Sequence, residues 1–566
     1  MSANQFQRAV LLTTFCFAAL ISSGLFAQED SAEKLTAERL FAAHRVTDIK
    51  IELAEADWDK IRFQSRSFSE ALTKKLPEKI FEYVKGNVTI DGILIENVGI
   101  RKKGFIGSLS TERPSLKIKF GEYIKQSPIS GLDRLTLNNN KQDAGRICQY
   151  LAYKLYRESG THAPRCGFAS VTVNGKHLGV YSNVEAIKPN FLEHSFGNKS
   201  GALYEGTVTD FFQEYVEKFE AKNKRAKFDD IQNVVDALAA DKMDEKQLAE
   251  LERFVDVESF IKFWAMESLI GFWDGYCSNQ NNYYLYHDAA SDKFHFIPWG
   301  TDSAFTETSP LPPYLIRPRS VHGKAILPNK LYRNDAIKAK YKTTLMSFLD
   351  EHWDEEKLGV EIDRLEALLR DYVLEDNQEF QEVLDQFRRF INSRRKAITG
   401  EYQKQLPKLA AKNQKPVYFS AIGTIKASFS TTWFDQEPTK APEEQSVDVS
   451  MTINGKEVII EDAIVYATTD KFNKDNASVV IKGKSKATGK EIIIGAGLPK
   501  SEFLVPSTES RNAAGVVLQP GILGMLNPKM KMMFGAIEIE KSSTEKGEPV
   551  KGKLNMAIGE FRGLGE

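Results

Sequence analysis

The chain has 566 residues, which is too long for one compact hydrophobic core, so we expect two or three domains. Its 76 lysine and arginine residues are balanced by 77 aspartate and glutamate residues. Proteins that bind nucleic acid usually carry a basic excess, and this balance therefore argues against a nucleic-acid partner.

The N-terminus has the pattern of a secretory signal. Arg8 precedes the apolar run AVLLTTFCFAALI, and small residues follow up to Ala27. A charged start, a short apolar core and a small final residue are typical of a cleaved signal peptide. We therefore predict a signal peptide over residues 1–27, a mature chain beginning near Gln28, and an exported protein (periplasm, cell surface or secreted). The apolar run is short for a membrane span, and we expect no stable span after cleavage.

Alternating strands dominate the chain up to residue 120. The segments VKGNVTI and ILIENVGIRKK form a predicted hairpin whose turn is Asp91-Gly92. In the next strand, SLKIKF, apolar residues alternate with Lys117 and Lys119, so the two lysines share one face. Lysines on strands commonly lie on a solvated face. The loop before this strand contains Gly104, but this is only a weak signal for a phosphate-binding loop.

A helix and a second hairpin follow. The segment LTLNNNKQDAGR leads into a predicted helix that Asp143 is placed to cap, with Arg146 on its first turn. Asn174-Gly175 predicts a tight turn between the strands FASVTVN and LGVYSNVEAI. Glu185 lies at the end of the second strand, where it either contacts a ligand or braces the backbone. We interpret residues 207–258 as a charged helical region with a solvated face.

The stretch from Phe272 to Phe305 contains the residues best suited to chemistry. Asp274 is followed five residues later by Asn279, and two aromatic alternating runs form a predicted hairpin that ends near Asp302. Protein kinases use the spacing Asp-x-x-x-x-Asn and a further aspartate to hold magnesium, a hard cation that prefers oxygen ligands. The same residue types also cap turns around hairpins, and one match to this spacing does not separate the two interpretations.

The pattern of the chain changes after residue 403. A buried helix, FIKFWAMESLIGFW, precedes Asp274, and predicted helices fill residues 329–403. The polar segment 404–415 is a predicted linker. Beyond it, short alternating strands over residues 416–566 predict a β-sandwich or barrel, which we interpret as an accessory binding or packing domain.

The central stretch resembles the signature of the CotH kinase family, a spore-coat-protein-H type of atypical protein kinase. The matching residues are Trp273-Asp274, Asn279, Asn281-Asn282, Tyr286 and the run Pro298 to Asp302. The LNNN segment and the hairpin around Asn174-Gly175 resemble the same family. The resemblance implies an α+β fold in which a two-lobed kinase-like domain, residues 33–403, precedes the all-β domain.

The resemblance also implies roles for individual residues. Asp274 would position or deprotonate the acceptor hydroxyl, and Asn279 and Asp302 would hold Mg²⁺ or Mn²⁺. Candidates for nucleotide binding are Lys117, Lys119, Arg146 and Glu185. Gly300 departs from the family pattern, because many members carry an aspartate there and the site then has one more carboxylate.

The family would act on protein substrates. The resemblance implies transfer of the γ-phosphoryl group of ATP to serine or threonine hydroxyls. Two alternatives remain open at this point: a catalytically weak pseudokinase that serves as a scaffold or a surface or matrix binding protein, and an enzyme that transfers another nucleotide-derived group such as adenylyl. An exported protein meets little ATP, which favours the scaffold alternative.

Overall fold

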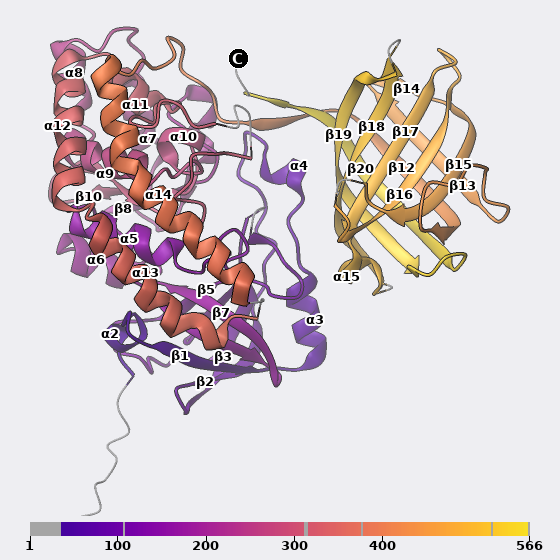
Figure 1. The fold of residues 1–566 in the computed structure, drawn as a ribbon, viewed down its shortest axis with the longest axis horizontal. Helices are drawn as coiled ribbons and strands as arrows, with labels where there is room; N and C mark the ends of the chain where they lie inside the picture. The colour runs from indigo at the N-terminus through magenta and orange to yellow at the C-terminus, as the bar shows by residue number, and fades with distance from the viewer. Residues whose placement is uncertain are drawn as a thin grey trace, which may run out of the picture.

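The computed structural model describes residues 35–105, 108–310, 315–374, 377–471, 473–505, 507–521 and 524–563. It has mixed α and β content with several sheets, and its C-terminal region is rich in strands (Figure 1). The predicted signal peptide, residues 1–27, lies outside the described residues. None of the helices in the described ranges is both long enough and apolar enough to cross a membrane.

A closed barrel forms the N-terminal part, with strand order β1-β2-β3-β4-β5-β7-β6. Its strands are β1 (Val46–Glu52), β2 (Val84–Ile90), β3 (Ile93–Lys102), β4 (Leu116–Lys119), β5 (Arg134–Asn138), β6 (Cys166–Val173) and β7 (Lys176–Val184). The parallel pairing of β1 with β6 closes the ring. Alternation places Leu116 and Ile118 in the barrel core, so the two lysines of β4 lie on its outer face.

Both predicted hairpin turns of this part are present. Asp91 and Gly92 have φ values of 47° and 84°, and Asn174 and Gly175 have 46° and 80°. Short helices flank the barrel: α2 (Ala37–Leu40), α3 (Glu55–Phe63) and α4 (Phe68–Ala71). Helix α5 (Cys148–Glu158) packs against β6 and against the helical part of the molecule.

The helical part surrounds a four-stranded sheet of order β11-β10-β8-β9. Its strands are β8 (Ala202–Gly206), β9 (Glu220–Ala221), β10 (Tyr283–Asp288) and β11 (Lys293–Pro298). Its helices are α6 (Pro189–Phe196), η2 (Gln213–Lys218), α7 (Phe228–Ala237), α8 (Glu245–Leu251), α9 (Val257–Leu269), α10 (Tyr276–Asn279), α11 (Ile326–Leu331), α12 (Asp335–Glu351), α13 (Glu355–Leu369), η3 (Arg370–Tyr372) and α14 (Asn377–Lys404). The interpretation of residues 207–258 as helical holds only for α7 and α8, because the aromatic segment before them buries its rings as η2 and joins the sheet through β9.

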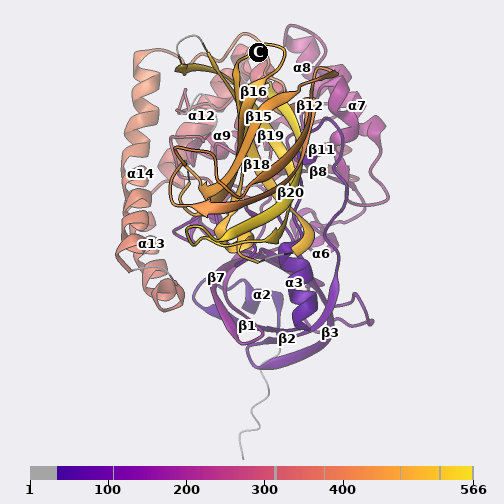
Figure 2. The same cartoon turned by 90° about the vertical axis from the view of Figure 1, so that its right-hand side faces the viewer.

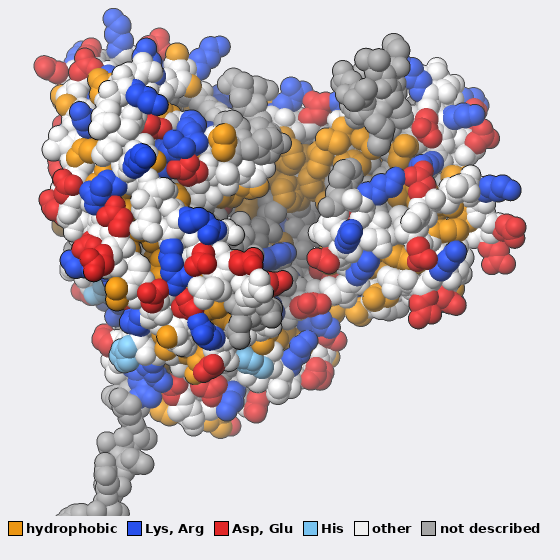
Figure 3. Space-filling model, in the orientation of Figure 1, with side chains coloured by type: hydrophobic (Ala, Val, Ile, Leu, Met, Phe, Trp, Pro, Cys, Tyr) orange, Lys and Arg blue, Asp and Glu red, His pale blue; other side chains and the backbone are white. Residues whose placement is uncertain are grey.

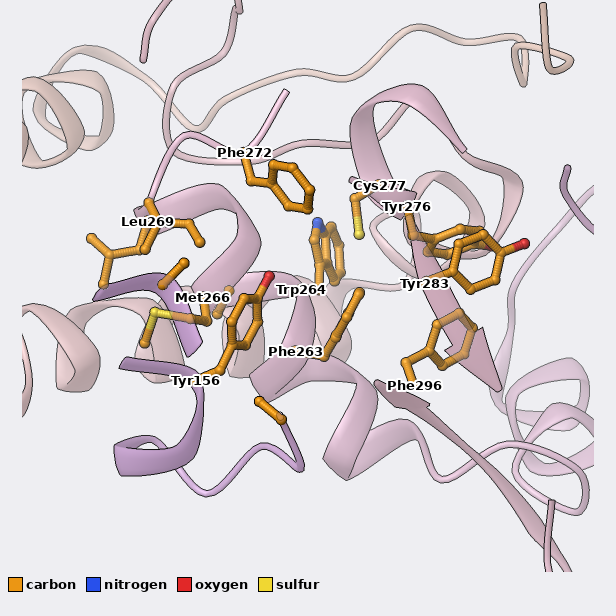
Figure 4. Packing of buried hydrophobic residues seen from close by; sticks show 14 of the residues in the cluster. Tyr156, Phe263, Trp264, Met266, Leu269, Phe272, Tyr276, Cys277, Tyr283 and Phe296 are labelled. Atoms are coloured by element: carbon orange, nitrogen blue, oxygen red, sulfur yellow. The ribbon is translucent and has the colours of Figure 1, made fainter. Parts of the chain in front are cut away.

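Helix α9 is the central element of this core. Trp264 is fully buried, and its ring lies 4.1 Å from that of Tyr341 on α12. Figure 4 shows Tyr276, Tyr283 and Phe296 grouped on one side of Trp264, and Phe263 packs against Phe296. The residues that flank Asp274 are therefore anchored on a helix that is buried from Phe263 to Leu269, as its apolar sequence predicts, while Glu258 in its first turn is exposed.

The C-terminal region is one nine-stranded sheet in the described part of the chain. Its elements are β12 (Tyr418–Phe434), β13 (Ser446–Ile453), β14 (Lys456–Glu457), β15 (Ile460–Thr469), β16 (Asn476–Ser485), β17 (Glu491–Pro499), α15 (Lys500–Phe503), β18 (Ser507–Gly521), β19 (Gly524–Lys541) and β20 (Pro549–Arg562). Because β12 pairs with both β15 and β20, the sheet closes on itself around an apolar core. Figure 2 shows this region above the β1–β7 barrel, with α14 along one side.

Candidate functional site

The Asp274 carboxylate is held by three asparagine side chains. Asn279 Nδ2 donates to Asp274 Oδ1 at 2.6 Å, and Asn281 Nδ2 donates to the same oxygen at 3.1 Å. Asn282 Nδ2 donates to Asp274 Oδ2 at 2.8 Å. Positive φ values at Gln280 and Asn282, 50° and 54°, turn the chain back so that three residues after Asp274 can reach it.

Burial raises the pKa of Asp274 to about 6, against the lowering effect of the asparagine hydrogen bonds. The negative charge of Asp302 contributes to the same rise. The carboxylate is thus oriented by neutral donors that leave its charge uncompensated. This arrangement suits a group that must hold a fixed direction and accept a proton.

Asp302 is brought to the same place by the hairpin of β10 and β11. It is 6% exposed, and its Oδ2 accepts a hydrogen bond from Asn138 Nδ2 at 3.5 Å. Burial raises the pKa of Asp302 to about 6, while the charge of Lys103 opposes the rise. Asn138 ends β5, so Asp302 lies where the barrel meets the helical part.

The donor set fits a hard divalent cation. Two buried carboxyls whose charges repel each other lie among side-chain amides, and carboxylate and amide oxygens are the ligands that Mg²⁺ prefers. The described residues contain no group of three or more His, Cys, Asp or Glu side chains arranged to hold a metal by themselves.

Lys117 lies in a cluster of cationic side chains on the outer face of the barrel. It is the cross-strand partner of Arg101, and Arg101 and Lys103 alternate along the end of β3. Burial, with the charges of Arg101 and Lys103, holds the pKa of Lys117 well below its usual range. Among the described residues, no carboxylate pairs directly with the ammonium of Lys117 or of Lys103. Lys119 differs, because it forms an ion pair with Glu122 at 2.6 Å.

Lys103 is the residue that sequence reasoning missed. Burial lowers its pKa to about 8, and the charge of Asp302 is the largest influence in the opposite direction. The charge of Lys103 therefore interacts with Asp302, which it attracts, and with Lys117, which it repels. Its signal in the sequence is the run IRKKG, in which Lys103 lies between the end of β3 at Lys102 and Gly104, whose φ is 129°. The alternating lysines of the next strand are a more conspicuous pattern.

The opposite wall of the cationic cluster comes from the four-stranded sheet. Glu205 of β8 forms an ion pair with Lys222 at 2.6 Å. Burial opposes ionisation of Glu205, but the charges of Lys222 and Lys117 hold its pKa below the usual range. Lys117 on the outer face of β4 therefore lies opposite Glu205 of β8, and the two side chains attract each other.

Arg146 and Glu185 make structural contacts. Arg146 is buried with φ 59°, and its Nη1 donates to the carbonyl oxygens of Asp143 and Ala144. Asp143 accepts from Cys148 N, the first N–H of α5, at 2.8 Å, but the N-cap residue is Ile147, so Asp143 reaches the helix end from outside it. Arg146 precedes α5, and the prediction that it lies on the first turn is wrong because its backbone has positive φ. Glu185 accepts from Arg165 Nη2 and from His194 Nε2, both at 2.8 Å. These contacts favour the bracing role of Glu185 over contact with a nucleotide.

Gly300 fits closely against the asparagine cluster. Its φ is 54°, and a Cβ atom at this position would lie 2.6 Å from Asn282 Oδ1. Asn282 in turn holds Asp274. The glycine is therefore required by the space beside Asn282 as well as by its backbone conformation.

Comparisons with known proteins agree with the geometry. The family model described as CotH kinase protein matches residues 100–409, more than half of the chain. Invasin CotH7 of Rhizopus delemar is 24% identical over 243 residues, which cover 39% of this chain and 40% of that protein. Inner spore coat protein H of Bacillus subtilis is 24% identical over 189 residues, which cover 31% of this chain and 51% of that protein. The chain thus spans about two fifths to one half of the length of these relatives.

Proposed function

The chain belongs to the CotH kinase protein family, and from this premise we propose that it transfers the γ-phosphoryl group of ATP to serine or threonine hydroxyls of a protein. The observation that supports this most directly is that Asp302 lies close enough to Asp274 and to Lys103 for their charges to interact, while Lys117 lies beside Lys103 on the barrel. Residues up to 200 positions apart in the chain converge there, and they supply both signs of charge that phosphoryl transfer requires.

Asp274 orients the acceptor hydroxyl and receives its proton. Its Oδ1 accepts two side-chain hydrogen bonds and its Oδ2 accepts one, so Oδ2 has the freer lone pair. We assign the proton to Oδ2. Three fixed donors keep the carboxylate aimed while its protonation changes, so little reorganisation accompanies the transfer.

Asp302 and Asn279 would hold a divalent metal ion, Mg²⁺ or Mn²⁺. When bound, the ion offsets the charge of the two aspartates and of the phosphate groups. Lys103 and Lys117 would contact phosphate oxygens from the barrel side. In this arrangement the β1–β7 barrel and the helical part are the two lobes of a kinase, with the nucleotide between them.

The proposal also covers where the protein is located and which two alternative functions compete with protein phosphorylation. The spore-coat and invasin names of the relatives, together with the predicted signal peptide, favour an exported protein. Gly300 leaves one carboxylate fewer than many family members have, which favours the pseudokinase scaffold as the second candidate. Transfer of adenylyl uses the same nucleotide and metal, and product analysis separates it from phosphoryl transfer.

The test is metal-dependent nucleotide binding and transfer measured side by side on the purified full chain. Asp302→Ala removes an oxygen ligand, so we expect metal and nucleotide binding to weaken together. Asp274→Asn keeps the shape but removes the base, so binding should persist while transfer falls by on the order of 10²–10⁴. Asp335→Asn, an exposed position on α12, is the control. If the wild-type chain binds no nucleotide with any divalent metal, both enzyme proposals fail and the scaffold remains.

A further inference from the structure

The C-terminal β region contacts the rest of the chain through a buried aromatic cluster. Phe534 of β19 stacks on Phe68 of α4 with ring centroids 4.4 Å apart, and Phe419 of β12 lies 5.3 Å from Phe534. Leu72 and Val208 are buried in the same cluster. Figure 3 shows a hollow between the two parts, with hydrophobic side chains gathered on the wall formed by the β region.

One member of this cluster is hydrogen-bonded to the asparagines of the candidate site. Val208 N donates to Asn281 Oδ1 at 3.2 Å. Asn281 Nδ2 donates to Asp274 Oδ1 at 3.1 Å. A residue packed on the β region is therefore two hydrogen bonds away from the carboxylate to which we assign the proton.

A second connection runs through Gln280, the buried residue between Asn279 and Asn281. Its Nε2 donates to the carbonyl oxygen of Gln414, in the segment that leads into β12. Gln414 Nε2 donates to Gly563 O at 2.8 Å, just after β20. Both ends of the β region thus meet at the back of the asparagine turn.

A third connection reaches the loop after β3, which carries Lys103 and Gly104. Phe105 packs against the aromatic cluster. Glu502 of α15 is half-buried, and burial raises its pKa while the charges of Lys102 and Arg511 oppose the rise. Asn512 Nδ2 of β18 donates to Ser65 Oγ at 2.6 Å beside this loop.

We propose that the β region, residues 418–563, is a positioning element of the candidate site. It fixes the position of the Asn279–Asn282 turn relative to the Lys103–Gly104 loop, and this keeps Asp274 and Lys103 on facing sides of the candidate site. This inference rests on the proposed function, and it extends that function to a region beyond residue 409, where the family match ends. It differs from the role of an independent binding module, which would leave both loops unchanged when the contact is weakened.

The test is amide hydrogen exchange on the full chain, without nucleotide. Phe534→Ala removes half of the aromatic stack from the β side, and Phe68→Ala removes it from the other side without altering the β region. We expect exchange in peptides covering residues 276–286 and 99–105 to rise at least about tenfold in both variants. Phe228→Ala, whose ring is 45% exposed at the start of α7, is the matched control and should change neither peptide. Phe534→Leu, which keeps apolar volume, should restore most of the protection.

A transfer assay on the same variants separates the two proposals. If the wild-type chain transfers phosphate, both alanine variants should lose on the order of tenfold to a hundredfold in kcat, because small displacements of an aligned base are costly. If the wild-type chain is inactive, the proposed function fails, yet the exchange data still decide whether the β region holds the loops. Unchanged exchange in both peptides, in folded Phe68→Ala and Phe534→Ala, overturns the positioning role.

Discussion

At the scale of single residues, the candidate site surrounds Asp274 with neutral amide donors, while the charge of Lys103 acts on Asp302. In the described part of the chain, Lys103 and Lys117 form no ion pair with a carboxylate. The family resemblance, and not spacing alone, named Asp274, Asn279 and Asp302 as candidates within one continuous stretch, and their roles stay predictions. The structure places Asn279 in hydrogen-bond contact with Asp274, and Asp302 close enough for its charge to act on Asp274. Sequence spacing could not select Lys103, whose importance comes from Asp302, a residue almost 200 positions later. Nor could it show that Arg146 and Glu185 are occupied by backbone and ion-pair contacts.

The lysines of the barrel give a test with an internal control. Lys103→Ala and Lys117→Ala each remove a half-buried lysine that forms no ion pair with a carboxylate in the described part of the chain, so we expect the Kd for the metal–nucleotide complex to rise about tenfold or more. Lys119→Ala removes a lysine on the same face that is paired with Glu122, and its effect should stay within about twofold. Calorimetric titration of the three variants measures this. Equal losses for Lys117→Ala and Lys119→Ala would show that the effect is only a change in overall charge.

Gly300 gives a second test. Gly300→Ala and Gly175→Ala both place a side chain at positive φ, which costs about 1 kcal/mol of stability. Only Gly300→Ala drives a Cβ atom into Asn282, whereas a Cβ at Gly175 meets nothing within 4 Å. We therefore expect Gly300→Ala to lose more stability than Gly175→Ala, because Asn282 must also move, and we expect a fall in transfer, about tenfold or more, for Gly300→Ala alone.

The same contact changes an expectation drawn from the family pattern. An aspartate at position 300 would meet Asn282 before it could reach a cation. Gly300→Asp is thus expected to disturb Asp274 rather than to tighten metal binding. Tighter metal binding by that variant would contradict this expectation and would show that the Asn282 side chain can move aside at little cost.

At the scale of elements, periodicity identified most of the structure. The strands of the barrel, the β10–β11 hairpin and the apolar helix α9 follow directly from alternation and from uninterrupted apolar faces. The segment before α7 did not, because its aromatic residues are buried by tertiary contacts with α10, β10 and β11 rather than by a helical period. Periodicity also does not predict that the two β parts close on themselves, because closure depends on pairings such as β1–β6 and β12–β20 between strands far apart in the chain.

Helix α9 supports the asparagine turn through Glu267. Its carboxylate accepts from Cys277 N at 2.7 Å, and a Cβ at Gly275 would lie 2.5 Å from its carboxyl carbon. Burial raises the pKa of Glu267 to about 8, although hydrogen bonds from the backbone of α10 oppose the rise. The folded chain therefore binds this proton more tightly than the unfolded chain does.

The sign of the pH dependence follows from that difference. Stability from this group is complete below the ordinary pKa of glutamate, near 4.5, and is lost as the pH rises through about 8. Glu267→Gln removes the titration, so we expect the variant to resemble the wild type at pH 5 and to be more stable at pH 9 by on the order of a few kcal/mol. Urea unfolding at both pH values measures this, with Glu258→Gln on the same helix as the control. Parallel behaviour of Glu267→Gln and wild type at both pH values would contradict it.

At the scale of the whole molecule, the predicted linker is more firmly attached than its composition suggests. Residues 404–406 and Lys408 are exposed, as a polar linker would be. Further on, however, Asn329 Nδ2 donates to Ala410 O at 3.1 Å, and Arg333 Nη2 donates to Ala411 O at 2.8 Å. Hydrophilic composition indicates solvent contact but does not reveal hydrogen bonds between a linker backbone and side chains of another part.

These contacts determine what limited proteolysis should produce. The sequence predicts cleavage in residues 404–415 and release of a stable β fragment. In the structure Lys404 and Lys408 are exposed, so cleavage is still expected there. The two fragments remain in contact, however, through the Gln280–Gln414 hydrogen bond and through the aromatic cluster of Phe68 and Phe534. We therefore expect trypsin to nick the chain there and the two fragments to co-elute in native gel filtration, separating only in denaturant. The same nick in Phe68→Ala should release the β fragment, because one side of the stack is lost. A β fragment that elutes alone from the nicked wild-type chain would mean that the two parts fold and act independently.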